Sequence, residues 1–408
     1  MKFGYFTLSD NRYPNNPRSP EQFLVEIRDQ AVLAEKLGFN SAWIGEHHFN
    51  RRGCVSVPAV VLANIAAATT RLRLGPAVVV LPIHHPIHVA EEWATLDQLS
   101  GGRVDFAAGR GYDRHEFTPF NVDFDSSAEQ FSEGIELLMR CWTETQPFDF
   151  KGRFYDFEDV EVFPKPVQKD FRPYMGSFSK FSMELAAKWD WNLLLAPFAA
   201  TILFGGLDKA VTAYREICEK TEKPAQKVKC SYFIHIGEGE DERQRALERM
   251  VGYATMAGLR KTMSLGGKGT LPPTMEYFKK IGERLNDAKA SDFDDNSLLY
   301  GSPQQIIDTL KRVEAIGIDE VILYFNFGNR PDAFVREQMH RFVADVAPTF
   351  GSATGETAAL VAHRPLHHDE TSRVTARPRQ ALDEAGPDRI GHGHEYDRHG
   401  AGHLLERM

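Results

Sequence analysis

Three ionisable residues stand together at the end of a short apolar run in the stretch SAWIGEHHF, residues 41–49. They are Glu46, His47 and His48. An imidazole has an ordinary pKa of about 6.5, so it can take up or release a proton near neutral pH. A neighbouring carboxylate can orient such a ring. The group is therefore a candidate for proton transfer, although a histidine in this place can also be a hydrogen-bonded structural residue.

Two other stretches contain residues that suit phosphate binding. Arg110 lies between glycines in AAGRGYDRHEF, residues 107–117. Ser179 and Ser182 lie in GSFSKFS, where a helix is expected to begin. Hydroxyl groups, amides at a helix N-terminus and an arginine form a natural phosphate clamp, and glycines let the backbone approach a ligand closely. Taken singly, the arginine can be a surface ion-pair partner and the serines can be capping residues. Together they indicate a phosphate-bearing ligand near the histidine pair.

The elements that must position these residues alternate between strand-like and helix-like segments. The expected strands are residues 2–7, 41–46, 72–82, 103–109, 172–177, 191–198, 229–237 and 320–327. The expected helices are residues 20–38, 57–70, 86–102, 127–142, 179–190, 207–220, 302–317 and 331–346. Eight strands that are each followed by a helix favour parallel pairing through crossover connections.

This alternation predicts an α/β protein built as a (β/α)8 TIM barrel. Such a barrel typically needs about 250 residues plus insertions, which suits the length of the chain. An open doubly wound sheet is the competing interpretation, but its usual signature, GxGxxG after the first strand, is absent. In a barrel the C-terminal ends of the strands meet at one face, where the chemistry collects. The three stretches follow strands two, four and five and would meet there.

Two segments exceed a minimal barrel. Residues 238–300 form an expected insertion between strand seven and helix seven, and an excursion at this end of a barrel strand is commonly a lid or a substrate wall. Residues 352–408 contain seven histidines but no Lys, Phe or Trp. We expect this stretch to be a flexible C-terminal tail outside the barrel domain of residues 1–351. Its segment 388–403 either holds a metal ion or binds nothing, and the second interpretation is favoured.

Composition narrows the class of protein. The chain has 408 residues, a net charge of −9 and 42% hydrophobic residues, which gives no reason to expect nucleic acid or an anionic membrane as a partner. No apolar run reaches the eighteen or so residues of a membrane span, and the N-terminus lacks the pattern of a secretory signal. Four widely separated cysteines are expected to be reduced thiols in a cytoplasmic protein: Cys54, Cys141, Cys218 and Cys230.

The sequence resembles the bacterial luciferase-like flavin-dependent monooxygenase family from Met1 to about Phe350. The resemblance rests on MKFGYF, GFNSAWIGEHHF, LGPAVVVLP, HPIHVAEEWATLDQLSGGRVDFAAGRG and the late YGSPQQIIDTL with GIDEV. The long block at residues 85–111 is the most specific of these. It also changes the interpretation of His85 and His88, whose HPxH spacing could suggest metal ligands. Beside the resemblance they are ordinary members of the connection after strand three, and no metal is expected.

The resemblance implies a barrel that binds reduced FMN at its C-terminal mouth. It implies that Arg110, Ser179 and Ser182 contact the flavin phosphate, and that Glu116 is an acid near the flavin. It places a non-proline cis peptide, Ala77–Val78, under the flavin ring. His47 matches the active-site histidine, with His48 and Glu46 as orienting partners.

The resemblance also implies a chemistry. Reduced FMN would react with oxygen to give a flavin hydroperoxide, which oxidises an aldehyde or ketone or hydroxylates a small organic substrate. Because no nicotinamide site is found in the sequence, a separate flavin reductase is expected to supply reduced FMN. Gly109 stands where luciferase has a reactive cysteine, and Phe178 stands where luciferase has a glutamate. These two departures argue against light emission from a long-chain aldehyde and leave the substrate open.

Two alternatives to an oxygenase remain. One is a deazaflavin-dependent dehydrogenase on the same fold, and the other is a non-catalytic flavin-binding protein. The EHHF block favours the oxygen-using enzyme over the first, and His47, Arg110 and both serines argue against the second. The small apolar residues of the helix at 57–70 also lead us to expect a homodimer, since family members pair through helices two and three.

Overall fold

The computed structural model describes residues 1–11, 13, 15–49, 53–254, 289, 293 and 298–351. The chain divides into two compact units, Met1–His363 and Arg364–Met408. The predicted tail at 352–408 and most of residues 255–297 lie outside the described residues. Within the described part of the chain, no helix is long and apolar enough to cross a membrane.

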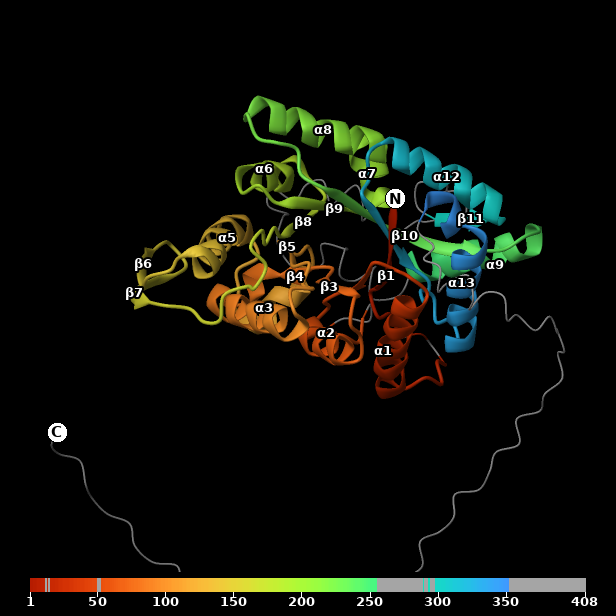
Figure 1. The fold of residues 1–408 in the computed structure, drawn as a ribbon, viewed down its shortest axis with the longest axis horizontal. Coiled ribbons are helices and arrows are strands. Elements are labelled where there is room, and N and C mark those ends of the chain that lie inside the picture. The colour runs from red at the N-terminus through yellow and green to blue at the C-terminus, as the bar shows by residue number, and fades with distance from the viewer. Residues whose placement is uncertain are drawn as a thin grey trace, which may run out of the picture. The chain divides into compact units, whose positions relative to one another are not determined.

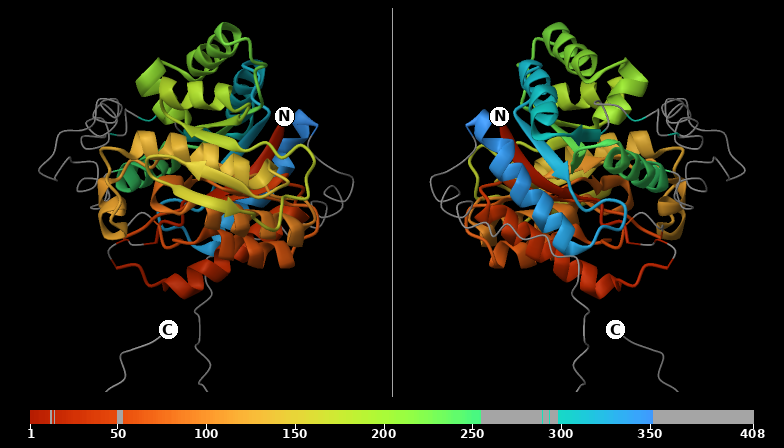
Figure 2. Two further views of the ribbon diagram at one scale, coloured as in Figure 1. Left: turned by 90° about the vertical axis from the view of Figure 1, so that its left-hand side faces the viewer. Right: turned by 90° about the vertical axis from the view of Figure 1, so that its right-hand side faces the viewer.

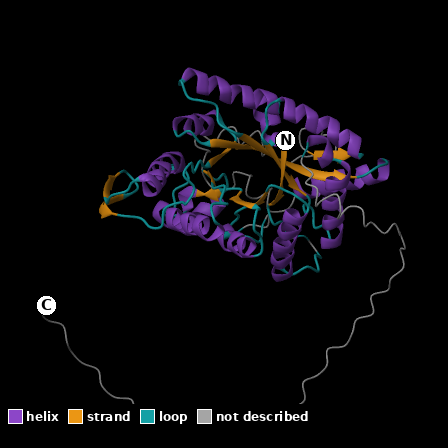
Figure 3. Ribbon diagram, in the orientation of Figure 1, coloured by secondary structure: helices purple, strands orange, loops and turns teal. Residues whose placement is uncertain are grey.

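The first unit is organised around one parallel sheet whose strands lie at the centre, with helices around them (Figures 1 and 3). Among the described residues the strands follow the order β3-β2-β1-β12-β10-β9-β8-β5-β4, and β11 pairs with β10. The strands are β1 (Lys2–Thr7), β2 (Ser41–Ile44), β3 (Arg73–Pro76), β4 (Val79–Val80), β5 (Ala107–Gly109), β8 (Tyr174–Ser177), β9 (Asn192–Leu195), β10 (Val228–Ile236), β11 (Leu298–Gly301) and β12 (Glu320–Tyr324).

The two ends of this order belong to one interrupted strand. β3 pairs with β2 and β4 pairs with β5, and only the cis peptide Ala77–Val78 separates β3 from β4. A parallel bridge between Leu74 and Val104 joins β3 to the segment before β5. The nine strands of the order therefore occupy eight positions around a barrel, and the predicted TIM-barrel fold is confirmed. The predicted continuous strand at 72–82 was wrong, because the chain breaks there to bridge two neighbours.

Alternating side chains along the strands supply two separate apolar regions. Tyr5, Leu193 and Leu323 pack in the large core between the sheet and the helices. Their neighbours in sequence, such as Phe6 and Leu194, belong to a second cluster inside the barrel. This alternation follows from the two-residue period of a strand.

A network of buried ion pairs lies at the N-terminal end of the barrel. Lys229 Nζ lies 2.7 Å from an oxygen of Asp105 and 2.8 Å from an oxygen of Glu320. Lys229 and Glu320 occupy the beginnings of β10 and β12, and they are paired in register. The cavity lined by the predicted site residues lies at the opposite, C-terminal end of the barrel.

The helices cover the outside of the barrel, and consecutive helices such as α1, α2 and α3 contact one another. α13 returns beside α1 near the N-terminal strand (Figure 2). The helices are α1 (Pro20–Lys36), α2 (Pro58–Ala67), α3 (Pro86–Ser100), α4 (Arg114–Phe117), α5 (Ser127–Thr143), α6 (Lys180–Lys188), α7 (Pro197–Phe204), α8 (Leu207–Lys220), α9 (Glu240–Ala254), α12 (Pro303–Ala315) and α13 (Asp332–Asp345).

Three features were not predicted. An antiparallel hairpin of β6 (Phe148–Lys151) and β7 (Asp156–Val160) follows α5, and the short helix α7 follows β9. The third is the strand β11, which ends the segment between β10 and α12 and extends the parallel pairing of β10; the helix α9 begins this segment, part of which was expected to be helical. The predicted insertion at 238–300 thus contributes a strand to the sheet as well as a helix.

Candidate active site

A cavity of about 220 Å³ opens at the C-terminal ends of the strands. Its walls come from the ends of β1, β2, β4, β5, β8 and β9 and from the beginning of α6. Apolar side chains such as Phe6, Val78 and Phe178 provide much of the wall. The polar residues that line the cavity are Glu46, His47, Arg110, Tyr112, Glu116, Ser177, Ser179, Ser182 and Ser231.

Three serine hydroxyls converge at one end of this cavity, where β8 leads into α6. Ser182 Oγ lies 2.8 Å from Ser177 Oγ and 3.1 Å from Ser179 Oγ. Ser179 is the N-cap of α6, and Ser179 and Ser182 form a capping box. The capping interpretation of these serines is therefore correct, and it places three hydroxyls at the positive end of a helix. With Arg110 on the same cavity, this donor set suits a phosphate group.

Two glycines allow the cis peptide to form part of the cavity wall. A Cβ atom at Gly109 would lie 2.7 Å from Val78 Cγ2, and one at Gly176 would lie 2.9 Å from Val78 Cγ1. Side chains at these positions would therefore collide with Val78. Because Gly109 on β5 and Gly176 on β8 have no side chains, the side chain of Val78 fits between these two strands.

His47 is oriented by Glu116. Its Nδ1 lies 3.3 Å from Glu116 Oε1, and the same oxygen accepts a hydrogen bond of 3.0 Å from the backbone N–H of His48. His47 Nε2 is buried and has no hydrogen-bond partner among the described residues. When Nδ1 carries the proton and donates it to Glu116, Nε2 is left as an acceptor. Because His47 lines the cavity, this arrangement offers one basic nitrogen for proton transfer.

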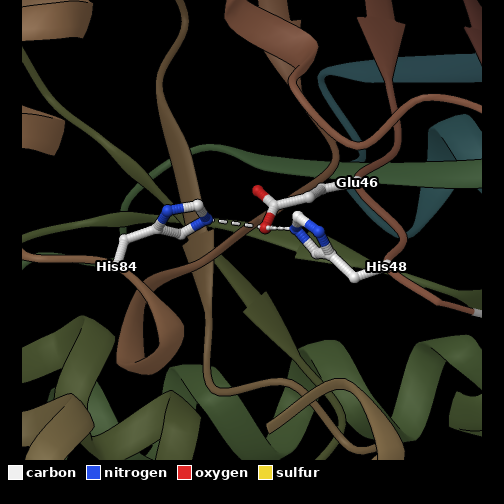
Figure 4. A group of neighbouring side chains, drawn as sticks. All are labelled: Glu46, His48 and His84. Carbon is white, nitrogen blue, oxygen red and sulfur yellow. Dashed lines mark hydrogen bonds and ion pairs between the residues drawn. The ribbon is translucent and has the colours of Figure 1, made fainter. Parts of the chain in front are cut away.

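A second carboxylate, Glu46, binds two other imidazoles. His48 Nε2 lies 2.9 Å from Glu46 Oε1, and His84 Nε2 lies 2.7 Å from the same oxygen. Figure 4 shows both rings pointing at this oxygen from opposite sides. Burial of Glu46 raises its pKa, but the hydrogen bonds from His48 and His84 outweigh burial and hold the pKa below its usual value. For His84, burial lowers the pKa, but the bond and charge of Glu46 raise it above its usual value.

Eight of the nine residues expected at the site line the cavity. They are Glu46, His47, Ala77, Val78, Arg110, Glu116, Ser179 and Ser182. His48 is not among the lining residues, and its ring contacts Glu46. The Ala77–Val78 bond is cis, as the resemblance implies.

Ser177 and His84 were not among the predicted site residues. Ser177 lies in GSFSKFS beside the two predicted serines, so the sequence contained a signal for it. His84 directly precedes His85 and was passed over for the HPxH pair. In the structure His88 Nδ1 pairs with Glu91, at 3.5 Å from its carboxylate, and the side chain of His88 is 84% exposed.

Comparison with known proteins identifies the family of the chain. The sequence pattern of the luciferase-like monooxygenases matches residues 1–320. The chain belongs to this family. Among its relatives, the oxygenase component of a flavin-dependent trigonelline monooxygenase of Acinetobacter baylyi is 24% identical over 371 residues. That match covers 86% of this chain and 96% of the relative.

Solved structures of luciferase-like proteins share the fold. A crystal structure of a monooxygenase from Streptomyces bottropensis is 26% identical, with a TM-score of 0.70, and covers 86% of this chain and 100% of its own. The oxygenating constituent of a diketocamphane monooxygenase from Pseudomonas putida, in complex with FMN, has a TM-score of 0.67 at 19% identity, covering 85% and 98%. An F420-dependent secondary alcohol dehydrogenase has a TM-score of 0.64 at 17% identity, covering 85% and 98%. The last two likenesses show the fold alone.

Proposed function

We propose that the chain is the oxygenase component of a two-component monooxygenase that uses reduced FMN and oxygen. The observation that carries this proposal is the cavity with two chemically distinct regions. One is the cluster of three serine hydroxyls, the other is the His47–Glu116 pair, and Arg110 lines the same cavity. A phosphate-bearing redox cofactor requires both an anchor and a reaction region.

The residues present fit a flavin phosphate. Ser177, Ser179, Ser182 and Arg110 would hold it, and Ala77 and Val78 would support the ring. Bound there, reduced flavin supplies the electrons that activate oxygen, and the protein supplies orientation and a water-poor site. The apolar wall of Phe6, Leu8 and Phe178 supports that role.

His47 is the proposed proton-transfer residue. Its Nε2 is buried, faces no protein partner among the described residues and belongs to a side chain on the cavity. Glu116 orients the ring of His47, and Glu46 binds the ring of the neighbouring His48. The buried free nitrogen is poised to take a proton from a substrate or to return one.

A separate flavin reductase is the proposed partner. The Acinetobacter relative is named as an oxygenase component, which supports a two-component system. We also propose a homodimer formed through α2 and α3, since Val60 on α2 is 66% exposed and Leu99 on α3 is 78% exposed. Sedimentation of the purified chain should give a dimer, and Val60→Lys should shift it toward the monomer.

The alternative function is that of a deazaflavin-dependent dehydrogenase, because the fold is shared with such an enzyme. The experiment that tests the proposal supplies photoreduced FMN with and without oxygen and screens aldehydes, ketones and amines by mass spectrometry. Products heavier by one oxygen atom, formed only with oxygen, are expected. Turnover of an alcohol with a deazaflavin under anaerobic conditions would support the dehydrogenase. Bound FMN without any turnover would support a non-catalytic flavin protein.

A further inference from the structure

Glu46, His48 and His84 span the distance between the cavity and the exterior. Glu46 lines the cavity, and its side chain is 1% exposed. His84 lies in the connection between β4 and α3, and its side chain is 32% exposed. The two residues are joined by a contact of 2.7 Å between Nε2 and Oε1 (Figure 4). Glu46, a polar residue of the cavity wall, is thus in direct contact with His84, whose side chain is partly exposed to solvent.

We propose that His84 and Glu46 form the route by which protons pass between solvent and the cavity. His84 is then a functional residue that acts through Glu46 without touching the reacting atoms. The use of these protons rests on the proposed function, because reduction of one oxygen atom to water consumes protons. The route itself depends only on the contacts of the two side chains.

The transfer conserves charge and involves no change of oxidation state. A hydronium ion from solvent protonates the neutral ring of His84 and becomes water, and the Nε2–H bond of His84 then breaks as an O–H bond forms on Glu46 Oε1. The carboxyl proton then leaves for an acceptor in the cavity, which restores the carboxylate. His84 regains its Nε2 proton by exchange with water.

The groups around His84 favour a protonated ring beside an ionised acid. Glu46 contacts it from the end of β2, and Glu92 acts on it from α3. His48 lies farther away, with 6.1 Å between the two ring centroids. Glu92 is exposed at the surface, and partial desolvation of its carboxylate raises its pKa. The hydrogen bond from Val80 N–H to Glu46 Oε2, at 3.4 Å, steadies the carboxylate.

A first test uses the flavin-free chain, so it does not depend on the proposed function. The histidine rings are labelled with nitrogen-15, metals are removed with a chelator, and His84 is titrated by NMR. We expect a pKa above the ordinary value and a return toward that value in Glu46→Gln. An unchanged titration in Glu46→Gln would overturn the proposal.

A second test measures proton delivery. The chain is mixed with photoreduced FMN and oxygen, and flavin oxidation is followed from about pH 6 to about pH 9. His84→Gln should bind FMN normally but oxidise it about tenfold more slowly, with the rate restored by added imidazole. The matched control is His88→Gln, an exposed histidine that pairs with Glu91 and should behave as the wild type.

Three results of the second test would overturn the proposal. One is a wild-type rate and pH profile for His84→Gln, and another is a slow rate that imidazole does not restore. The third concerns metal: the donor atoms of Glu46, His48 and His84 lie within 4.8 Å of one another, a spacing that could also hold a metal ion. If the purified chain carries a stoichiometric metal ion and loses the oxidation rate on chelation, these side chains hold metal and do not relay protons.

Discussion

The imidazole of His47 faces the carboxylate of Glu116, with 3.3 Å between Nδ1 and Oε1. His47 lies in the loop after β2 and Glu116 lies on the short helix α4 that follows β5, so the two residues are 69 positions apart in the chain. Because the same Glu116 oxygen accepts the N–H of His48, it fixes both the backbone and the ring of the histidine pair. The tautomer of His47 thus depends on a residue that does not itself carry out the transfer.

Substitution of Glu116 should slow turnover more than it weakens flavin binding. In Glu116→Gln the amide oxygen can still accept from Nδ1–H, so we expect a loss of about tenfold in rate. Glu116→Ala leaves the ring unsupported and should lose about a hundredfold. Stopped-flow oxidation of reduced FMN measures the rate, and fluorescence quenching measures binding. Equal rates for both variants and the wild type would show that the pair has no role.

The hydroxyl of Ser182 should contribute to FMN affinity through the phosphate alone. Ser182→Ala removes the group that contacts both Ser177 and Ser179, and we expect FMN to bind about tenfold more weakly, which is about 1.4 kcal/mol. Riboflavin lacks the phosphate, so its affinity should not change.

The chain offers a matched control for this experiment. Ser302 caps α12 in the same kind of capping box, with Gln305, but does not line the cavity. Ser302→Ala should cost about 1 kcal/mol of stability without changing FMN affinity. If Ser182→Ala weakens riboflavin as much as FMN, the hydroxyl does not contact the phosphate.

The location of the site could be predicted because parallel strands in a barrel end at the same face. Residues 46–48, 110 and 179–182 are far apart in the chain, yet each follows a strand, and this alone brings them together. The details depended on side-chain directions, which sequence does not give. His84 and His85 are adjacent and identical in type, but only His84 Nε2 contacts Glu46. His85 instead caps α3 by accepting from the N–H of Ile87.

The places where the alternation of strands and helices is interrupted were also hard to predict from the sequence. The run LRLGPAVVVLP is rich in apolar residues typical of one long strand, although Gly75 and Pro76 within it are a local signal for an interruption. The cis bond within it was expected only from resemblance. The hairpin at 148–160 did have a signal, since alternating aromatic residues flank Gly152, and the buried Phe148 and Phe150 are two positions apart.

Gly109 and Gly176 should not tolerate a methyl group. In Gly109→Ala the new Cβ would lie 2.7 Å from Val78 Cγ2, so either Val78 or β5 must shift. We expect a loss of about 1–3 kcal/mol in the free energy of unfolding and weaker flavin binding. Adding Val78→Ala should recover much of the stability. Gly252→Ala on α9, where a Cβ meets nothing within 4 Å, is the control and should be neutral or stabilising. Normal stability of Gly109→Ala would contradict the close packing at Val78.

Asp10 should make the stability depend on pH in a direction that is unusual for an acid. It is fully buried and accepts hydrogen bonds from Tyr13, Tyr324 and the N–H of Gly328. Burial raises its pKa from 3.8 to about 6, although these hydrogen bonds oppose the shift. Between these two values the folded chain binds more protons than the unfolded chain, so stability falls as pH rises. A shift of this size corresponds to about 3 kcal/mol.

Asp10→Asn isolates this contribution, because the neutral amide does not titrate. The free energy of unfolding of the variant minus that of the wild type should increase from about pH 4 to about pH 7 and then stay constant. Urea unfolding at a series of pH values provides the measurement, and the change in the difference matters more than its starting value. A difference that is constant with pH would mean that Asp10 ionises as readily in the folded chain as in the unfolded one, and a difference that decreases would mean that it ionises more readily in the folded chain. Either result would contradict the raised pKa of Asp10.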